Sequence, residues 1–184
     1  MMEKKLYTLL VYTENRAGIL SQITSVFTRC QINIESLNVS AYDLLGVHKH
    51  VITAWSDEEQ IKKTVKLIEK KVDVIKANYN TDEQLFVQEV ALYKISTPVL
   101  LENPDVSRTI RRLNAYMMEV NPTYSIVQYA GKSEDLKELS DRLTAFGCLL
   151  QYSRSGRIAV TRSKEEPITA YLNELKEADG SNDA

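Results

Sequence analysis

The sequence contains few of the residues that build metal, redox or phosphate sites. Its 184 residues include two cysteines, two histidines and six glycines. Cys30 and Cys148 lie far apart in apolar stretches, which fits reduced interior thiols better than a disulfide framework. His48 and His50 share one face of a predicted strand, but a metal site needs three or four ligands and the spacing suggests no others. The scattered glycines do not form a phosphate-binding loop.

The sequence also has no excess of charge of one sign and no long hydrophobic run. It lacks the short motifs of the common enzyme families. The sequence has 23 basic and 25 acidic residues and a net charge of -2, so nothing draws it toward nucleic acid or an anionic membrane. The first apolar run, residues 6–13, is too short to span a membrane. No catalytic constellation stands out. We therefore expect a cytoplasmic protein that recognises its partners by shape and specific groups.

The first 80 residues predict the element order βαββαβ. Strands are expected over residues 6–13, 32–41, 47–55 and 72–79, and the phase of the second slips by one near Glu35 and Ser36, which predicts a β-bulge. The first helical stripe is Ile19, Leu20, Ile23, Val26, Phe27 and Cys30, and the second is Ile61, Val65, Ile68 and Val72. Asp57 and Gln60 have capping-box spacing. Turn residues occupy positions 43–46.

The third predicted strand is apolar on both faces, so the sheet needs two covers. Helices can cover one face. We expect the other face to meet a second domain or another subunit.

The same order of elements recurs after the polar stretch NTDE at residues 80–83. Asn103 is expected to cap a helix that has Pro104 at its first position, with the stripe Val106, Ile110, Leu113 and Met117. Ser133 begins another helix that Gly147 ends, and residues 148–152 and 157–161 are predicted to form a hairpin. The fold class is thus α+β, with two consecutive ferredoxin-like βαββαβ domains. The expected divisions are residues 1–80, a linker at 81–84, a second domain at 85–163, and a tail at 164–184 with a short helix and a disordered GSNDA end.

The turn ENRAGIL, residues 14–20, has chemistry that its backbone supplies. A helix N-terminus leaves N–H groups unpaired and carries partial positive charge, so it can bind a carboxylate. Gly18 permits close approach to the main chain, and the Asn15 amide can serve both an ammonium group and a carboxylate. These features suit a free amino acid. They also suit an ordinary strand-to-helix turn capped by Asn15, and Asn33 could equally be a simple turn or edge residue.

Several stretches carry a family resemblance: ENRAGILSQITSVFTRCQINIESLNVS, KKVDVIKAN, VQYAG at residues 127–131, and RSG at residues 154–156. The sequence resembles the regulatory small subunit of acetolactate synthase, in which the first half is an ACT domain and the second half is a C-terminal domain typical of that family. The matching positions are Glu14, Asn15, Gly18, Leu20, Asn33, Ile34, Ser36, Leu37 and Val39.

The resemblance implies a subunit without activity of its own in branched-chain amino acid biosynthesis. It would bind and activate the catalytic subunit, which carries thiamine diphosphate, Mg and FAD, and it would need no cofactor itself. It would confer feedback inhibition by valine or a related amino acid, held between two ACT domains of a homodimer. The implied effector-binding residues are Asn15, Arg16, Ala17, Gly18, Ile19 and Leu20 of one chain and Asn33 and Ile34 of its neighbour.

The sequence departs from the family pattern at three positions. Gln22 replaces a basic residue, and Gln31 replaces the glycine that commonly ends the first helix, which removes the easiest left-handed cap. Ile19 is bulkier than usual beside the expected pocket, and one methylene can alter which amino acid fits.

Other functions on the same topology fit less well. An ACT domain that regulates another metabolic enzyme is the nearest alternative, and the VQYAG and RSG stretches argue against it. An acylphosphatase would use Arg16 and Asn38 but needs a turn richer in glycine. An RNA-binding module needs stacking aromatics where this chain has Val47, Lys49 and Val51.

Overall fold

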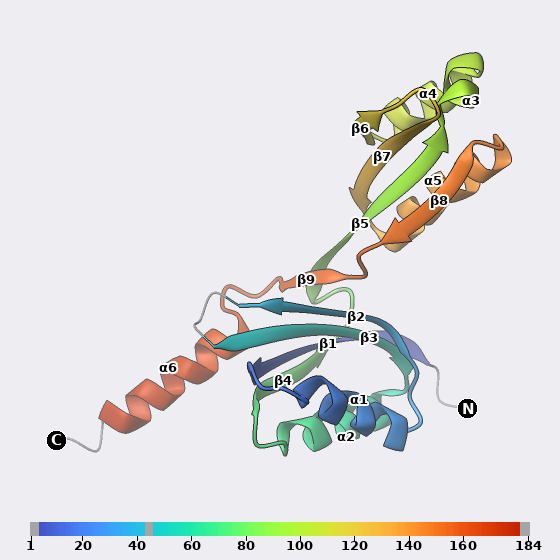
Figure 1. Ribbon diagram of the computed structural model, residues 1–184. Coiled ribbons are helices and arrows are strands. Elements are labelled where there is room, and N and C mark those ends of the chain that lie inside the picture. The colour runs from blue at the N-terminus through green and yellow to red at the C-terminus, as the bar shows by residue number, and fades with distance from the viewer. Residues whose placement is uncertain (1–3, 43–45, 181–184) are drawn as a thin grey trace. The chain divides into compact units, whose positions relative to one another are not determined.

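The computed structural model of the protein describes residues 4–42 and 46–180. The chain divides into two compact units: unit 1 is Met1–Val87 with Arg157–Ala184, and unit 2 is Gln88–Gly156. Figure 1 shows a sheet with helices against one face in each unit. The predicted fold class, two ferredoxin-like βαββαβ folds, is confirmed. Within the described residues, no helix is both long enough and apolar enough to cross a membrane.

Unit 1 contains an antiparallel sheet in the order β2-β3-β1-β4. Its elements are β1 (Lys5–Glu14), α1 (Ile19–Arg29), β2 (Ile34–Ala41), β3 (Val47–Ser56), α2 (Glu58–Glu69) and β4 (Val74–Asn80). Asp57 caps α2 as predicted, because its side chain accepts from the Gln60 N–H at 2.8 Å. The predicted bulge is also present, as a register shift between Ile34 and Ser36. Predicted turn residues 43–45 lie outside the described residues.

Helices α1 and α2 cover one face of this sheet and form its main core (Figure 1). The apolar stripe of α1 is buried at Ile19, Ile23, Val26 and Phe27, and that of α2 at Ile61, Val65 and Ile68. The prediction was wrong for Val72, which is 96% exposed. Because α2 ends at Glu69 and β4 begins only at Val74, this residue lies in the connection and not on the helix.

The second face of the unit 1 sheet is covered by the C-terminal part of the same chain. Leu10, Tyr12 and Val51 on this face pack with Leu85, Ala159 and Ile168. Strand β9 (Ile158–Thr161) and helix α6 (Pro167–Gly180) provide this cover. The sheet therefore has the two covers that its sequence requires, and part of the second belongs to the predicted tail. The disordered GSNDA end was predicted over residues 180–184; Gly180 belongs to α6, and residues 181–184 lie outside the described residues.

Unit 2 is built on an antiparallel sheet in the order β6-β7-β5-β8. Its elements are β5 (Leu85–Ser96), which begins in unit 1, α3 (Thr97–Glu102), α4 (Pro104–Arg112), β6 (Tyr116–Val120), β7 (Tyr124–Gly131), α5 (Ser133–Ala145) and β8 (Leu149–Arg154). As predicted, Asn103 caps α4 and accepts from the Asp105 N–H at 3.0 Å. Met117 was wrongly placed on the stripe of this helix, since α4 ends at Arg112 and Met117 is a half-exposed residue of β6.

The predicted hairpin of residues 148–152 and 157–161 is also wrong. Both β8 and β9 pair with β5 and not with each other. Ser155 donates its N–H to the Val90 carbonyl, and Arg162 donates to that of Gln84. The segment between β8 and β9 therefore continues alongside β5 instead of reversing.

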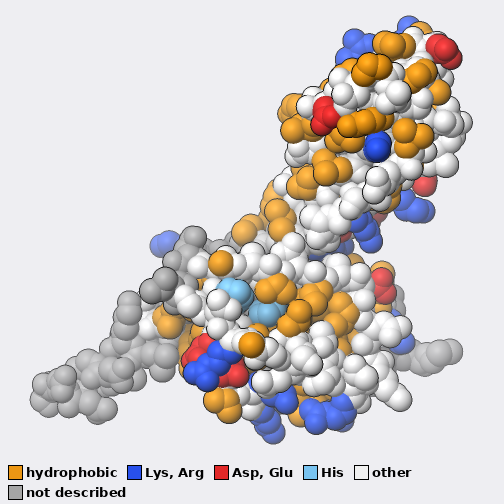
Figure 2. All heavy atoms as spheres, viewed as in Figure 1, with side chains coloured by type: hydrophobic (Ala, Val, Ile, Leu, Met, Phe, Trp, Pro, Cys, Tyr) orange, Lys and Arg blue, Asp and Glu red, His pale blue; other side chains and the backbone are white. Residues whose placement is uncertain are grey.

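Unit 2 exposes several large hydrophobic side chains, and Figure 2 shows such side chains gathered on its visible face. Among them are Leu92, Tyr116, Met118, Val120 and Leu150.

Helix α1 ends in a left-handed residue that is not glycine. Gln31 has φ 55°, and the Ile32 N–H donates to the Phe27 carbonyl at 3.0 Å. This is the position at which the sequence lacks the expected glycine. An L residue in this conformation costs about 1–2 kcal/mol, which glycine avoids at the expense of some entropy in the unfolded chain.

We expect Gln31→Gly to raise the free energy of unfolding by about 0.5–1 kcal/mol, measured by denaturant titration. The matched control is Gln22→Gly inside α1, which should lower it by about 1 kcal/mol because glycine disfavours a helix interior. A loss of stability in Gln31→Gly would contradict this account of the helix end.

Candidate effector-binding site

The turn after β1 is exposed and leads into α1 through a left-handed glycine. Gly18 is the N-cap residue, with φ 88° and ψ -11°, and no side chain caps the helix. The interpretation of Asn15 as an ordinary cap is therefore wrong. Backbone N–H groups in the first turn of a helix, here those of Leu20 and Ser21, have no intrahelical carbonyl to donate to. They remain suited to an anionic ligand.

Backbone hydrogen bonds hold this turn on two sides. The Glu14 N–H donates to the Asp73 carbonyl at 2.9 Å, and the Asn15 N–H donates to the Gly46 carbonyl at 2.8 Å. Asp73 precedes β4, whereas Gly46 belongs to the connection between β2 and β3. The position of Asn15 thus depends on a hairpin that is distant in sequence.

Arg16 points its charge toward carboxylates of its own chain. Its Nε lies 2.8 Å from Glu14 Oε2 and 3.4 Å from Asp73 Oδ1. Such exposed pairs contribute little to stability, but they engage the guanidinium group. The main chain of the turn is therefore the better candidate for receiving a carboxylate.

Glycine suits position 18 because of the positive φ there, and not because neighbouring atoms leave no room for a side chain. A Cβ atom built at this position would meet no atom within 4 Å, so a side chain there would reach into open space. Neighbouring residues differ in exposure: Ala17 is exposed, Ile19 is 5% exposed and belongs to the core, and Leu20 is 40% exposed. Leu20 is thus more available to a ligand than Ile19.

Asn33 and Ile34 lie at the opposite end of α1. Together with residues at the end of that helix they line a shallow hollow of about 410 Å³. The other lining residues are Thr24, Phe27, Thr28, Gln31 and Ile32. Because α1 has 11 residues, its length of roughly 16 Å separates Asn33 and Ile34, which follow its C-terminal end, from the Gly18 turn. Within one chain the two groups of predicted residues are not brought together.

His50 is a buried group beside this turn, which the sequence analysis considered only as half of a histidine pair too small for a metal site. It is 1% exposed, and its Nε2 lies 3.0 Å from Thr13 Oγ1, just before the turn. Burial, and to a lesser degree the neighbouring His48, lowers the pKa of His50 to about 4. The sequence contained a sign of this burial. Alternate residues of a strand lie on the same face, and His50 shares its face with Ile52, which is in the core. Among the described residues no cluster of ligands could hold a metal ion.

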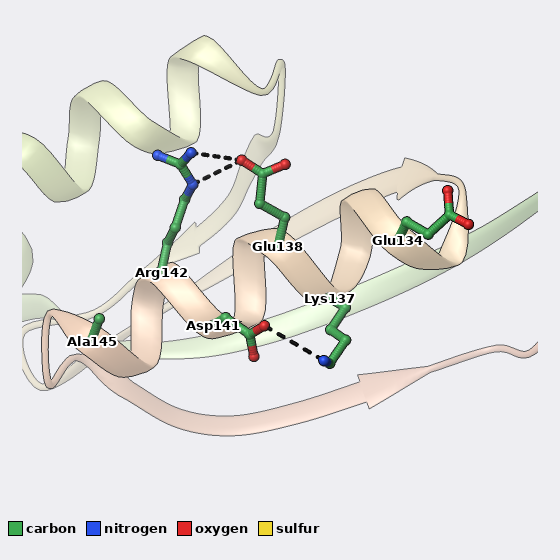
Figure 3. A pocket seen from close by; sticks show the side chains of 6 residues that line it. All are labelled: Glu134, Lys137, Glu138, Asp141, Arg142 and Ala145. Atoms are coloured by element: carbon green, nitrogen blue, oxygen red, sulfur yellow. Dashed lines mark hydrogen bonds and ion pairs between the residues drawn. The ribbon is translucent and has the colours of Figure 1, made fainter.

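A second hollow lies over α5 in unit 2, lined by charged residues that pair with one another (Figure 3). Arg142 bonds to Glu138 at 2.7 Å, and Lys137 lies 3.9 Å from Asp141. Glu134 and Ala145 complete the lining. These i,i+4 pairs are typical of a solvated helix face.

Comparison with known proteins assigns both units to one family. Residues 9–76 match the model described as AHAS small subunit-like ACT domain, and residues 88–163 match the small subunit of acetolactate synthase. The chain belongs to the acetolactate synthase small-subunit family. The family resemblance seen in the sequence is thus confirmed.

Curated members of this family match over most of their length. The acetolactate synthase small subunit of Bacillus subtilis is 28% identical over 169 residues, which cover 91% of this chain and 95% of that protein. That of Mycobacterium bovis is 27% identical over 161 residues, covering 88% and 95%. The crystal structure of the small subunit from Thermotoga maritima has a TM-score of 0.78 at 19% identity, and the match covers 88% of this chain and 99% of that one. This last likeness supports the fold.

Proposed function

We propose that the protein is the regulatory subunit of acetolactate synthase, which activates a separate thiamine-diphosphate-dependent catalytic subunit and makes it sensitive to valine. The observation that carries this proposal is the match of both units to domains of the same small subunit. An ACT domain that regulates another enzyme would not need the second match. The subunit itself is not catalytic, and thiamine diphosphate, Mg and FAD belong to its partner. We place it in the cytoplasm.

We further propose that valine binds between the ACT domains of a homodimer. One chain contributes the turn from Asn15 to Leu20, and its neighbour contributes Asn33 and Ile34. Two observations support a shared site: the turn offers exposed backbone donors, and α1 separates it from Asn33 in the same chain. We assign the ACT domain to residues 1–80 and the C-terminal domain to residues 85–163, of which residues 157–163 belong to compact unit 1.

Reconstitution tests the regulatory role. The protein is mixed with the acetolactate synthase catalytic subunit of the same organism, and acetolactate formation is followed with and without valine. We expect the mixture to be more active than the catalytic subunit alone, and valine to remove much of that activity. Coupling of about 1–3 kcal/mol corresponds to 5- to 150-fold control.

A pull-down from the native host separates the two candidate functions. Recovery of a thiamine-diphosphate enzyme as the main partner supports this proposal. Recovery of another metabolic enzyme, together with no activation in the mixture, would favour the alternative ACT regulator.

A further inference from the structure

The C-terminal segment is anchored to the second face of the unit 1 sheet by the carboxylate of Glu166. The Tyr12 hydroxyl donates to it at 2.6 Å, and the Tyr42 hydroxyl and the Lys49 ammonium group donate as well. The two tyrosine rings meet edge to face, with centroids 5.6 Å apart. Just after Glu166, the side chain of Ile168 is fully buried against the same face.

The charge of Glu166 is compensated where it lies. Burial alone would raise the pKa of this carboxyl group, but the hydrogen bonds from Lys49, Tyr12 and Tyr42 outweigh burial and hold the pKa below its usual value. The carboxylate is therefore ionised at neutral pH. Removing a partner from such a pair leaves an uncompensated charge, so the network favours one docked arrangement of the segment.

The same Glu166 carboxylate contacts both arms of the β2–β3 hairpin. This hairpin accepts a hydrogen bond from the turn at residues 14–20, which we call the effector turn. Tyr42 follows β2 and Lys49 lies in β3, so Glu166 contacts each arm of the β2–β3 hairpin. Gly46, in that hairpin, accepts the hydrogen bond from the Asn15 N–H at 2.8 Å. The Tyr42 N–H also donates to the Val47 carbonyl at 2.9 Å, and Val47 directly follows Gly46 in the chain. Hydrogen bonds and this short piece of backbone thus lead from the C-terminal segment to the candidate site.

We propose that Glu166 is a positioning residue of the effector turn: by holding the β2–β3 hairpin, it fixes the Gly46 carbonyl and, through it, Asn15. Docking of the C-terminal segment consequently raises the affinity of the turn for its ligand. The identity of that ligand, valine, rests on the proposed function. The link from Glu166 to Asn15 does not, because it is a property of the ligand-free chain.

Hydrogen exchange of the Asn15 amide, followed by NMR in the full-length protein without ligand, tests the link directly. We expect exchange about five- to tenfold faster in Glu166→Gln and in Tyr42→Phe, as for the loss of one hydrogen bond. Tyr42→Phe loses only a hydroxyl group, so it serves even if Glu166→Gln does not fold.

A matched control separates this effect from general loosening. Glu165→Gln removes the same charge from the exposed preceding residue and should leave Asn15 exchange near wild type. Amides of α2, such as that of Ile68, should exchange at the wild-type rate in every variant.

Valine titration of the same variants completes the test. We expect the Kd for valine to rise about five- to tenfold in Glu166→Gln and Tyr42→Phe only. Unchanged Asn15 exchange in both of these variants would overturn the positioning role, whatever valine does. If the wild-type protein binds no valine, valine is not the effector and that part of the proposed function is wrong. The hydrogen exchange of the Asn15 amide still decides the positioning role of Glu166.

Discussion

Replacing Gly18 by aspartate should abolish valine binding and feedback while leaving activation of the catalytic subunit intact. The new side chain enters the open space above the start of α1, where the ligand carboxylate is proposed to lie. Two like charges about 4 Å apart repel by several kcal/mol near a protein surface, so the Kd should rise at least about 100-fold. Calorimetric titration of the protein and valine inhibition of the reconstituted enzyme measure the two effects.

Two further variants make this result specific. Gly147 in unit 2 also has a positive φ of 67° and open space around it, so Gly147→Asp carries the same backbone cost and charge away from the site. Gly18→Asn matches the size of aspartate without its charge and should weaken binding less. If the Gly18→Asp enzyme remained fully sensitive to valine, the turn at residues 14–20 would not be part of the valine site.

Mixed dimers then test whether two chains share the site. Gly18→Asp and Asn33→Ala should each fail to bind valine as homodimers. In a heterodimer one site has both defects, and the other combines a normal turn with a normal Asn33. Random exchange of equal amounts makes half of the dimers heterodimers, so we expect about a quarter of the wild-type binding capacity of the mixture to return. No recovery would contradict a site built from both chains.

The second large effect concerns the pH dependence of stability. His50 has a pKa of about 4 in the folded protein against an ordinary value of 6.5, because burial, and then His48, disfavour its charged form. Below pH 6.5 the unfolded chain binds a proton that the folded chain does not accept until near pH 4. The free energy of unfolding should therefore fall by about 3 kcal/mol across this interval, and this group should have no effect above it.

Urea titrations at pH 7, 5.5 and 4 measure this contribution. His50→Gln, which cannot titrate, should lose about 3 kcal/mol less than wild type between pH 7 and pH 4. His48→Gln is the matched control and should retain most of the dependence, because His50 is still buried in it. Equal losses in wild type and His50→Gln would mean that His50 is not the group responsible.

Local signals in the sequence predicted local structure well. The Asp57 and Asn103 caps and the bulge before Ser36 follow from residues within a few positions of each other, and the structure contains all three. The errors at Val72 and Met117 arose because an apolar period can continue past the end of a helix into the next connection or strand. Periodicity alone does not mark that end.

Long-range pairing could not be predicted in the same way. The β9 strand looked like the second arm of a hairpin, but its partner is β5, some seventy residues earlier. The candidate site shows the same division. Its turn was recognised from ENRAG, whereas the contact of Asn15 with Gly46 and that of Tyr12 with Glu166 join distant residues. No sequence pattern predicts either contact. Every residue has a backbone carbonyl, and the sequence does not distinguish Glu166 from the other glutamates of the chain.

The order of the units along the chain has a consequence for protein engineering. Unit 1 is interrupted, because residues 88–156 are inserted between its β4–β5 region and its own β9 and α6. Truncation after residue 80 would therefore strip the second cover from the ACT sheet and expose Leu10, Tyr12 and Val51. Excising residues 88–156 and closing the gap with a two-residue hairpin turn would retain β9, α6 and Glu166. The smallest form of unit 1 that keeps both covers of its sheet is thus obtained by internal deletion and not by shortening the chain.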